Sequence, residues 1–328
     1  MKCRSVANRL AEIPESPTTT RVIRKAFLPG AGLGTRLRPL TDLLPKPLVP
    51  LFHRPLIEWS MRACAAAGIT DFAINTHHLP DCWETGYGRL DVDNWFTGDL
   101  TGGNGLPVRE GRWEGRPVHL FHEPEVLETG GGIKNAETWS AGESVLVHNG
   151  DIYSTLPLER LLAAHEASGN PVTLALRSTG PLHIAFDGEK AVDIRNRLGR
   201  GEGTHAFSGI YCYTPALLDL IPAGEKISVI PAFLELAERG QLGAVLLDEG
   251  VWYDLGDAES YLRAHRELDL DLAIHTLAKV DPSATVRDSV VSAHARVGPG
   301  SVVEGSVLWP GAVVKGGEAV ASRILLPG

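Results

Sequence analysis

Long apolar runs, paired cysteines and a leader-like beginning are all missing from this sequence. No apolar stretch approaches the roughly 18 residues that a membrane-spanning helix needs. The four cysteines, at positions 3, 64, 82 and 212, show no paired spacing, so a reduced setting is expected. Residues 1–20 contain charges, prolines and threonines but no apolar core of a signal peptide. We therefore expect a cytoplasmic protein with a flexible extension over residues 1–20 and no membrane partner.

Positive charge is also in deficit. The chain holds 31 Lys and Arg against 40 Asp and Glu, a net charge of −9, which argues against nucleic acid as a partner. The deficit is uneven, because residues 1–54 hold ten Lys and Arg against three acids. This region therefore carries +7 and the remainder −16. A local basic zone on an acidic protein favours a small anionic ligand.

One stretch of the basic zone combines a glycine turn with two cations. The short run 22–28 is apolar and rich in β-branched residues, although Arg24 and Lys25 break it, and it predicts a strand. The three glycines that follow allow a tight turn whose N–H groups can approach an anion. Arg36 can donate two hydrogen bonds to phosphate oxygens, and Lys46, held between two prolines, can add a point charge. The glycines are Gly30, Gly32 and Gly34.

Two familiar phosphate-binding loops do not fit this spacing. The loop of nucleotide hydrolases needs Gly-Lys-Ser/Thr where Gly34 is followed by Thr35-Arg36, and the dinucleotide fingerprint needs a glycine where Leu37 stands. The pattern Gly-x-Gly-Thr-Arg-Leu-x-Pro-Leu-Thr followed by Pro-Lys-Pro-Leu-Val-Pro instead closely resembles the signature of the sugar-1-phosphate nucleotidyltransferases. Pro29-Gly30 departs from the Leu-Ala of many relatives, but proline here is familiar from UDP-glucose pyrophosphorylases.

The chain from residue 21 to 275 alternates predicted strands and helices, which is typical of an α/β domain. The resemblance implies a Rossmann-like nucleotidyltransferase domain with a mixed, mostly parallel sheet. Residues 81–117 are rich in glycine and tryptophan and predict a long surface excursion, either packed on the domain or acting as a lid. Gly130–Gly132 are expected at the mouth of a helix over residues 133–139, where free N–H groups favour an acceptor.

Residues 276–328 differ from the preceding residues in composition and periodicity. Aliphatic residues recur there every five or six positions, with glycines and prolines between them, which predicts a short left-handed parallel β-helix of about two turns. So short a coil leaves apolar surface uncovered. We therefore expect this segment to pack on the catalytic domain and to mediate a homo-oligomer. The periodic residues are Val280, Val286, Val291, Val297, Val303, Leu308, Val314 and Val320.

Two aspartates are candidate metal ligands. Asp151 follows a predicted strand in Asn-Gly-Asp, and Asp254 lies in a predicted turn in Trp-Tyr-Asp-Leu-Gly. Mg²⁺ commonly takes one or two carboxylates plus phosphates and water, so this pair suits nucleotidyl transfer. The resemblance implies that Asp151 and Asp254 hold Mg²⁺ while Arg36 and Lys46 act on the phosphates.

The same resemblance assigns the two substrates, an NTP and a sugar 1-phosphate. It implies nucleotide contacts from the first glycine loop and the second glycine run, and sugar contacts from three further residues. The nucleotide set is Gly30, Gly32, Gly34, Thr35, Gly130, Gly131 and Gly132, and the sugar set is Glu128, Ser208 and Gly209.

Substrate identity is left open by the motifs. Leu127-Glu-Thr-Gly-Gly-Gly-Ile133 and Phe207-Ser-Gly-Ile210 look like N-acetylmuramate-1-phosphate uridylyltransferases, whereas the β-helical tail looks like mannose-1-phosphate guanylyltransferases. The Glu-Lys-Pro sugar motif of the latter is missing, and Asp193–Arg197 stand near its place. Alternatives are a catalytically silent regulatory subunit and a phosphocholine cytidylyltransferase, which would need an aromatic cage for the quaternary ammonium.

Overall fold

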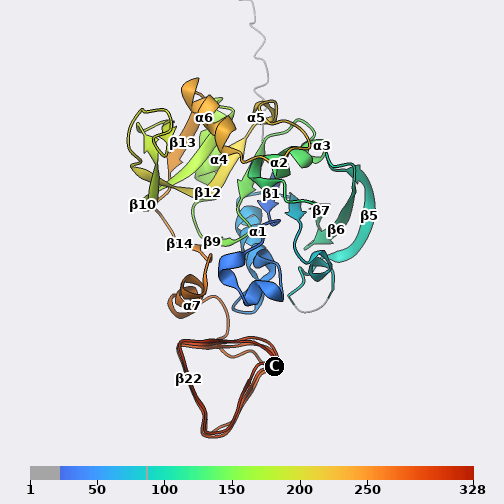
Figure 1. Cartoon of the computed structure of the whole chain (residues 1–328), viewed down its shortest axis with the longest axis vertical. Helices are drawn as coiled ribbons and strands as arrows, with labels where there is room; N and C mark the ends of the chain where they lie inside the picture. The colour runs from blue at the N-terminus through green and yellow to red at the C-terminus, as the bar shows by residue number, and fades with distance from the viewer. Residues whose placement is uncertain (1–22, 86–87) are drawn as a thin grey trace, which may run out of the picture.

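The computed structural model describes residues 23–85 and 88–328. The expected N-terminal extension, residues 1–20, lies outside these described residues. Figure 1 shows a large α/β body and, separated from most of it by helix α7, a three-sided coil of short strands seen end-on. The division expected at residue 275 falls between α7 (Ala258–Glu267) and the first strand of the coil, β15 (Lys279–Val280).

A mixed sheet forms the centre of the α/β body. Its described strands run in the order β11-β10-β12-β8-β1-β4-β7-β6-β5, with β13 also paired to β10. The four central strands are parallel, and both edges are mostly antiparallel. The predicted mixed α/β sheet is confirmed. The bounds are β1 Lys25–Pro29, β4 Asp71–Thr76, β7 Arg116–His122, β8 Val145–His148, β12 His205–Tyr213, β10 Val172–Phe186, β11 Ala191–Ile194, β13 Leu242–Leu246, β6 Pro107–Trp113 and β5 Asp93–Thr101.

Strand β1 lies at the point where the strand order reverses. It pairs with β4 on one side and with β8 on the other, both in parallel. Ligands of open α/β sheets bind beyond the carboxyl ends of the strands at such a switch point. The glycine loop begins here, directly after Pro29.

Helices cover both faces of the sheet, so the three successive apolar residues of β1, Ala26 to Leu28, are all buried. Leu28 and Leu146 face a buried cluster shared with α1 (Leu56–Ala66) and α4 (Leu158–Ser168). Their neighbours Phe27 and Val147 face the opposite cluster. That second cluster includes residues of α2 (Glu128–Asn135), α3 (Glu137–Ser140), α5 (Pro215–Leu218) and α6 (Ile230–Glu238).

The expected surface excursion over residues 81–117 is largely sheet. Strands β5 and β6 pair with each other and continue the sheet beyond β7, all in antiparallel fashion. Trp113 is buried against Phe72, with ring centroids 5.8 Å apart. The glycines and tryptophans of this region therefore belong to an edge hairpin that packs on the domain, the first of the two expected roles, although the excursion is built of strands.

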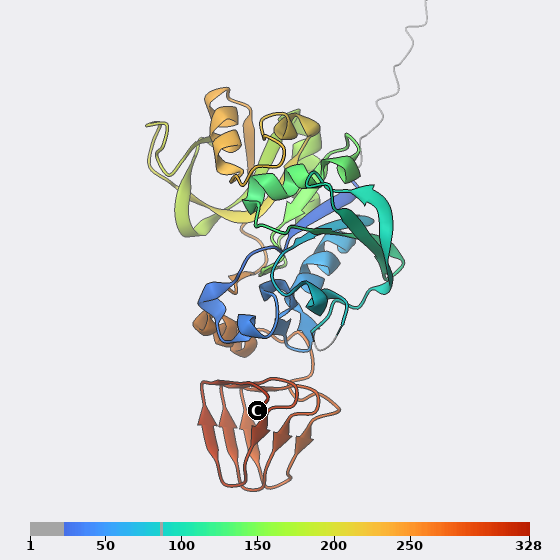
Figure 2. The same cartoon turned by 45° about the vertical axis from the view of Figure 1, so that its right-hand side comes forward.

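The C-terminal coil has three faces, each made in the described chain of three parallel strands. Lys279 pairs with Arg296 and Arg296 with Val313, so one turn takes 17 residues. The predicted parallel β-helix is confirmed, but instead of about two turns each face has three strands, stacked in layers that repeat every 17 residues and seen from the side in Figure 2. The strands are β15, β16 Thr285–Arg287, β17 Val290–Val291, β18 Arg296–Val297, β19 Val302–Glu304, β20 Val307–Leu308, β21 Val313–Val314, β22 Ala319–Ala321 and β23 Ile324–Leu325.

The β-helix packs on the α/β body, as expected. Trp309, Val290 and Val307 are buried in the same cluster as residues of α1 and α7. Among the described residues, no helix is long and apolar enough to span a membrane.

Candidate active site

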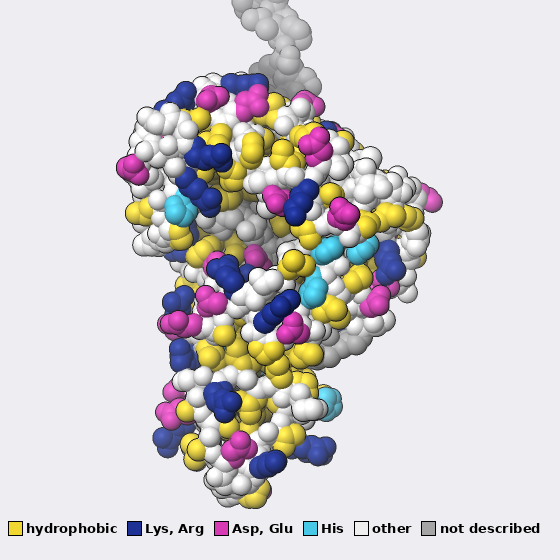
Figure 3. Space-filling model, in the orientation of Figure 1, with side chains coloured by type: hydrophobic (Ala, Val, Ile, Leu, Met, Phe, Trp, Pro, Cys, Tyr) yellow, Lys and Arg dark blue, Asp and Glu magenta, His cyan; other side chains and the backbone are white. Residues whose placement is uncertain are grey.

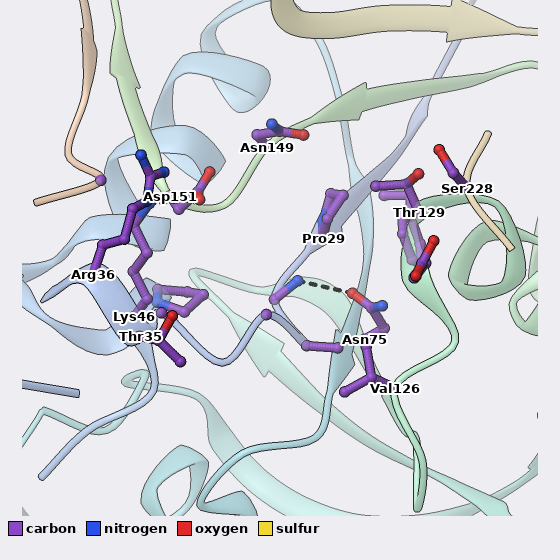
Figure 4. A pocket seen from close by; sticks show the side chains of 18 residues that line it. Pro29, Thr35, Arg36, Lys46, Asn75, Val126, Thr129, Asn149, Asp151 and Ser228 are labelled. Atoms are coloured by element: carbon purple, nitrogen blue, oxygen red, sulfur yellow. Dashed lines mark hydrogen bonds and ion pairs between the residues drawn. The ribbon is translucent and has the colours of Figure 1, made fainter. Parts of the chain in front are cut away.

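The glycine loop after β1 is shaped by close packing. A Cβ atom on Gly30 would lie 2.8 Å from the carbonyl oxygen of Asn75 and 3.2 Å from Cγ2 of Ile74. The N–H of Gly30 donates to Oδ1 of Asn75 at 2.8 Å, the contact drawn in Figure 4. Only glycine can bring the chain this close to the end of β4.

Gly34 turns the loop back so that Arg36 and Lys46 face the same place. Gly34 has a φ of 61° and caps the short 3-10 helix η1 (Thr35–Leu37). A Cβ on Gly34 would lie 2.8 Å from Cγ2 of Thr41 and 3.0 Å from Cβ of Lys46. A Cβ on Gly32, by contrast, would meet nothing within 4 Å. Gly34 is therefore required by the protein's own packing, whereas Gly32 leaves open space.

Lys46 lies between the two predicted metal ligands. Its Nζ is 2.7 Å from Oδ2 of Asp151 and 3.7 Å from Oδ1 of Asp254, and its side chain is only 9% exposed. The aspartates meet because β14 (Trp252–Asp254) pairs with β9 (Ile152–Ser154), which places Asp254 opposite the residue after Asp151. Residues 103 positions apart thus share one site.

The two carboxylates fit a Mg²⁺ ion that takes its other ligands from phosphates. Both are partly open, with side chains 35% and 47% exposed, and the contact of each with one ammonium shows that they can converge on a single cation. Within residues 23–85 and 88–328, no group of three or more His, Cys, Asp or Glu residues could hold a metal. The site therefore suits an ion with one or two protein carboxylates rather than a complete protein cage.

Two cavities meet at this cluster. The first has a volume of about 490 Å³ and the second of about 350 Å³. Arg36, Asn149 and Asp151 line both. Figure 3 shows the surface hollowed between the part of the body carrying β10 and the part carrying β5 to β7. Two ligands in these cavities would therefore approach each other at the cationic and carboxylate groups.

The first cavity has a cationic end, whereas the rest of its lining is mostly uncharged, with Glu128 as the exception. In Figure 4, Thr35, Arg36, Lys46 and Asp151 lie on one side, while Asn75, Val126, Thr129 and Ser228 lie on the other. A nucleoside triphosphate has the same division between its phosphates and its base. Of the predicted nucleotide contacts, Gly30, Gly32, Gly34 and Thr35 line this cavity.

The second glycine run does not lie where the sequence predicts. Helix α2 begins at Glu128, so Gly130–Gly132 are inside the helix and do not line either cavity. The N–H groups of Gly130 and Gly131 both donate to the carbonyl of Ile227, at 2.9 and 3.0 Å. The expectation of free N–H groups was wrong, because the segment of Ile227 already satisfies two of them and packs too closely for a side chain.

The predicted sugar contacts divide between the two cavities. Ser208 and Gly209 line the second cavity, and Gly209 has a φ of 78°. The hydroxyl of Ser208 donates to the carbonyl of Ala175 at 2.8 Å, so it is already used within the protein. Glu128 instead lines the first cavity, with a left-handed φ of 61° that costs backbone energy for a non-glycine residue.

A buried polar network that the sequence prediction missed supports the first cavity. Asn75 accepts from Gly30 and donates to Oε1 of Glu123 at 2.7 Å, and Oε2 of Glu123 accepts the N–H of Leu127 at 2.9 Å. Burial raises the pKa of Glu123, although the donors Leu127 and Asn75 oppose it. The network ties the glycine loop to the start of α2. Its sequence signal was the position of Asn75 at the carboxyl end of a predicted strand.

Comparison with known proteins points to one family. Residues 25–183 match the model of the nucleotidyl transferase family. A probable mannose-1-phosphate guanylyltransferase 2 of Arabidopsis thaliana is 28% identical over 273 residues, 79% of this chain and 67% of that protein. The mannose-1-phosphate guanylyltransferase of Mycobacterium tuberculosis is 28% identical over 72% of this chain, and the match spans only 62% of that protein. An N-acetylmuramate alpha-1-phosphate uridylyltransferase of Neisseria meningitidis is 29% identical over 71% of this chain and 93% of its own length.

Solved structures share the fold. A UTP-bound UGPase of Acinetobacter baumannii has a TM-score of 0.58 at 18% identity, covering 74% of this chain and 92% of that one. A putative glucose-1-phosphate thymidylyltransferase of Bacillus anthracis has a TM-score of 0.59 at 18% identity, covering 76% and 97%. The glycine loop, the family match over residues 25–183 and the named relatives all point to the sugar-1-phosphate nucleotidyltransferases, which this chain resembles.

Proposed function

We propose that this protein transfers a nucleotidyl group from an NTP to a sugar 1-phosphate, giving an NDP-sugar and pyrophosphate. The observation that carries this proposal is the meeting of two cavities at Arg36, Asn149 and Asp151. The first cavity would hold the NTP and the second the sugar 1-phosphate. A phosphate oxygen of the sugar 1-phosphate attacks the α-phosphorus, and the bond from that phosphorus to the pyrophosphate oxygen breaks.

The chain's own groups position and neutralise the phosphates. Such transfers depend mainly on in-line alignment and charge stabilisation. Arg36 lies at the junction of the cavities and can pair with phosphate oxygens of either substrate. Buried Lys46 adds a fixed cation. Asp151 and Asp254 would hold Mg²⁺. The ion would offset the negative charge of the two carboxylates, which otherwise repels the anionic triphosphate.

Among substrates, we favour UTP with an N-acetylmuramate-type 1-phosphate over GTP with mannose 1-phosphate. The motifs of residues 127–133 and 207–210 support the first, and the uridylyltransferase of Neisseria is matched over 93% of its length. Phosphocholine is the third candidate, because Phe207, Phe233 and Trp252 line the second cavity. The cation of Arg195 in the same cavity opposes a quaternary ammonium.

Pyrophosphate release from a matrix of five nucleoside triphosphates against several sugar 1-phosphates and phosphocholine tests the proposal. Activity with one pair, dependent on a divalent metal, is the expected result. A protein that binds nucleotide sugars but releases no pyrophosphate with any pair would be the regulatory alternative. The retained cluster of Arg36, Lys46, Asp151 and Asp254 argues against that alternative. We further propose a cytoplasmic location, supported by the free thiols of Cys64, Cys82 and Cys212, and a homo-oligomer formed through the β-helix.

A further inference from the structure

The loop after β11 folds around a carboxylate of that strand, Asp193, which does not line the second cavity. Asp193 is fully buried, and its Oδ1 accepts the N–H groups of Ile194 at 2.6 Å and Leu198 at 3.1 Å. Its Oδ2 accepts the N–H groups of Leu198 and Arg200, each at 3.0 Å. Burial alone would raise the pKa of Asp193, but these donors lower it overall. Both carboxylate oxygens of Asp193 therefore accept backbone N–H groups of the loop, and neither is available to a sugar hydroxyl.

The loop folded around Asp193 presents a cation to the cavity. Arg195 and His183 both line the cavity, and the N–H of Arg195 donates to the carbonyl of His183 at 2.7 Å. Arg195 has a left-handed φ of 55°, a conformation that is uncommon for a residue with a long side chain. Within the described part of the chain, its guanidinium has no hydrogen bond or ion pair. Figure 3 shows Lys, Arg and His side chains beside the hollow on the β10 side.

Arg195 lies far along the cavity from the reacting centre. Strand β12 runs along the cavity between these two places. At Ile210 it pairs with His148 of β8, which directly precedes the Asn149–Asp151 turn. At His205 it pairs with Ile184 of β10, and Ile184 also pairs with Ile194, the residue before Arg195. The five residue steps from His205 to Ile210 correspond to roughly 16 Å of extended chain. A sugar whose phosphate lies at Asp151 would therefore extend its far substituents towards Arg195.

The remaining lining favours an acidic rather than a neutral sugar. Leu174, Ile184 and Phe207 provide apolar surface. Among described lining residues, the carboxylates are Asp151 and Asp254, which lie with Lys46 at the reacting end. Hydroxyl groups of an unmodified hexose would thus find no carboxylate acceptor at the β11 end, whereas an anion would find Arg195.

We propose that the sugar 1-phosphate carries a carboxylate on a ring substituent and that Arg195 binds it. This rests on the proposed nucleotidyl transfer and adds to it a charge requirement and a specificity-determining residue. A guanidinium binds a carboxylate through two parallel hydrogen bonds. Since the substituent does not react, the contact strengthens ground and transition states alike, so its loss raises KM and leaves kcat unchanged.

The test uses three sugar 1-phosphates that differ at one group: N-acetylmuramate 1-phosphate, the same sugar with its carboxylate converted to the primary amide, and N-acetylglucosamine 1-phosphate. Pyrophosphate release with UTP gives kcat and KM for the unaltered protein, Arg195→Gln, Arg195→Lys and the control Arg197→Gln. Arg197 is exposed on the same loop and does not line the cavity. Isothermal titration measures binding of each sugar 1-phosphate independently of turnover.

We expect the acid to be preferred over its amide by about 10- to 100-fold in kcat/KM. Arg195→Gln should remove this preference through KM, Arg195→Lys should keep part of it, and Arg197→Gln should keep all of it. Equal use of acid and amide by the unaltered protein, or a preference that survives Arg195→Gln, overturns the inference while leaving nucleotidyl transfer standing. If no sugar releases pyrophosphate, the proposed function is overturned, and titration alone then tests the role of Arg195. Tighter binding of the acid than of the amide, lost in Arg195→Gln, supports that role, and equal binding of the two refutes it.

Discussion

The indole N–H of Trp309, in the β-helix, donates a hydrogen bond to the hydroxyl of Tyr261, in α7, at 3.1 Å. The hydroxyl of Tyr261 in turn donates to the carbonyl of Pro50 at 2.6 Å. Pro50 lies in β2 (Pro50–Leu51), just beyond the short helix η3 (Lys46–Leu48) that carries Lys46. One buried hydroxyl thus joins the β-helix to the segment that supplies a cation of the site.

Tyr261→Phe should therefore destabilise the protein without removing any group from the site. The change leaves the carbonyl of Pro50 and the indole N–H without this buried partner, which costs about 1–3 kcal/mol. Urea unfolding measures the loss. Tyr253→Phe is the control, since the hydroxyl of Tyr253 donates to Glu267 on the surface. A loss no larger for Tyr261→Phe than for Tyr253→Phe would show that the buried contact contributes nothing.

Asp151→Asn or Asp254→Asn should lower kcat by on the order of 100-fold or more, because each removes a charge needed to hold the metal. The melting temperature should change little, since both side chains are partly exposed. Asp281→Asn, in the β-helix, controls for a general effect of charge. Excess chelator should abolish turnover in the unaltered protein. Full activity in chelator would refute metal dependence.

Two glycines of one loop should respond differently to the same substitution. Gly34→Ala forces a Cβ into Thr41 and into a left-handed backbone, so it should lower stability by about 1–3 kcal/mol along with activity. Gly32→Ala meets nothing within 4 Å and should leave the melting temperature unchanged. If the nucleotide occupies that space, Gly32→Ala should raise KM for the NTP. An unchanged KM would place the nucleotide elsewhere.

Much of the fold and the charged cluster could be predicted from the sequence. The spacing of Arg36 and Lys46 after a glycine turn, and the position of Asp151 after a strand, are local signals. Gly130–Gly132 were misplaced because glycine is a poor helix former, and their hydrogen bonds to the carbonyl of Ile227 join segments far apart in the sequence. The inward turn of Asp193 was equally hidden, since its partners depend on how the following seven residues close into a loop.

Acid should destabilise the protein between pH 6.5 and about 4. Burial lowers the pKa of His148, His165 and His265 to about 4, below the ~6.5 of an unfolded histidine. The unfolded chain therefore binds more protons in this window, so stability is complete above it and falls as the pH falls. Each of these histidines should lower the free energy of unfolding at pH 5.5 by about 1 kcal/mol relative to pH 7.5.

His265 offers a direct check of that effect. Its Nε2 accepts the N–H of Phe52 at 3.0 Å, and its Nδ1 donates to the carbonyl of Tyr261 at 2.9 Å, so protonation of Nε2 breaks a buried bond. The glutamine of His265→Gln can still accept one hydrogen bond and donate the other, but it does not titrate. The decrease in the free energy of unfolding from pH 7.5 to 5.5, measured with urea, should therefore be about 1 kcal/mol smaller in this variant. The exposed His294→Gln should leave the loss unchanged. Identical losses in the two variants would contradict the assignment.

The exterior of the β-helix is where we expect a second copy to bind. Val302 and Val313 are 43% and 53% exposed on two different faces, in strands β19 and β21. Apolar side chains so placed favour association. Deleting residues 276–328 would also uncover the buried contact with Tyr261, so aggregation of that truncation would not separate oligomer contacts from folding. Point changes on the outer faces avoid this difficulty.

Val313→Glu and Val302→Glu should shift the full chain from oligomer to monomer, measured by light scattering at micromolar concentration. A carboxylate at the centre of an apolar contact must be desolvated without a partner, which costs several kcal/mol in association. Lys279→Glu is the matched control, because Lys279 occupies the same outward row as Val313 two layers away and is already charged. Nucleotidyl transfer per site should persist in all three variants, since the β-helix contributes no residue to either cavity. A full-length chain that scatters as a monomer would refute the oligomer, and oligomers that survive both valine changes would place the contact on another surface.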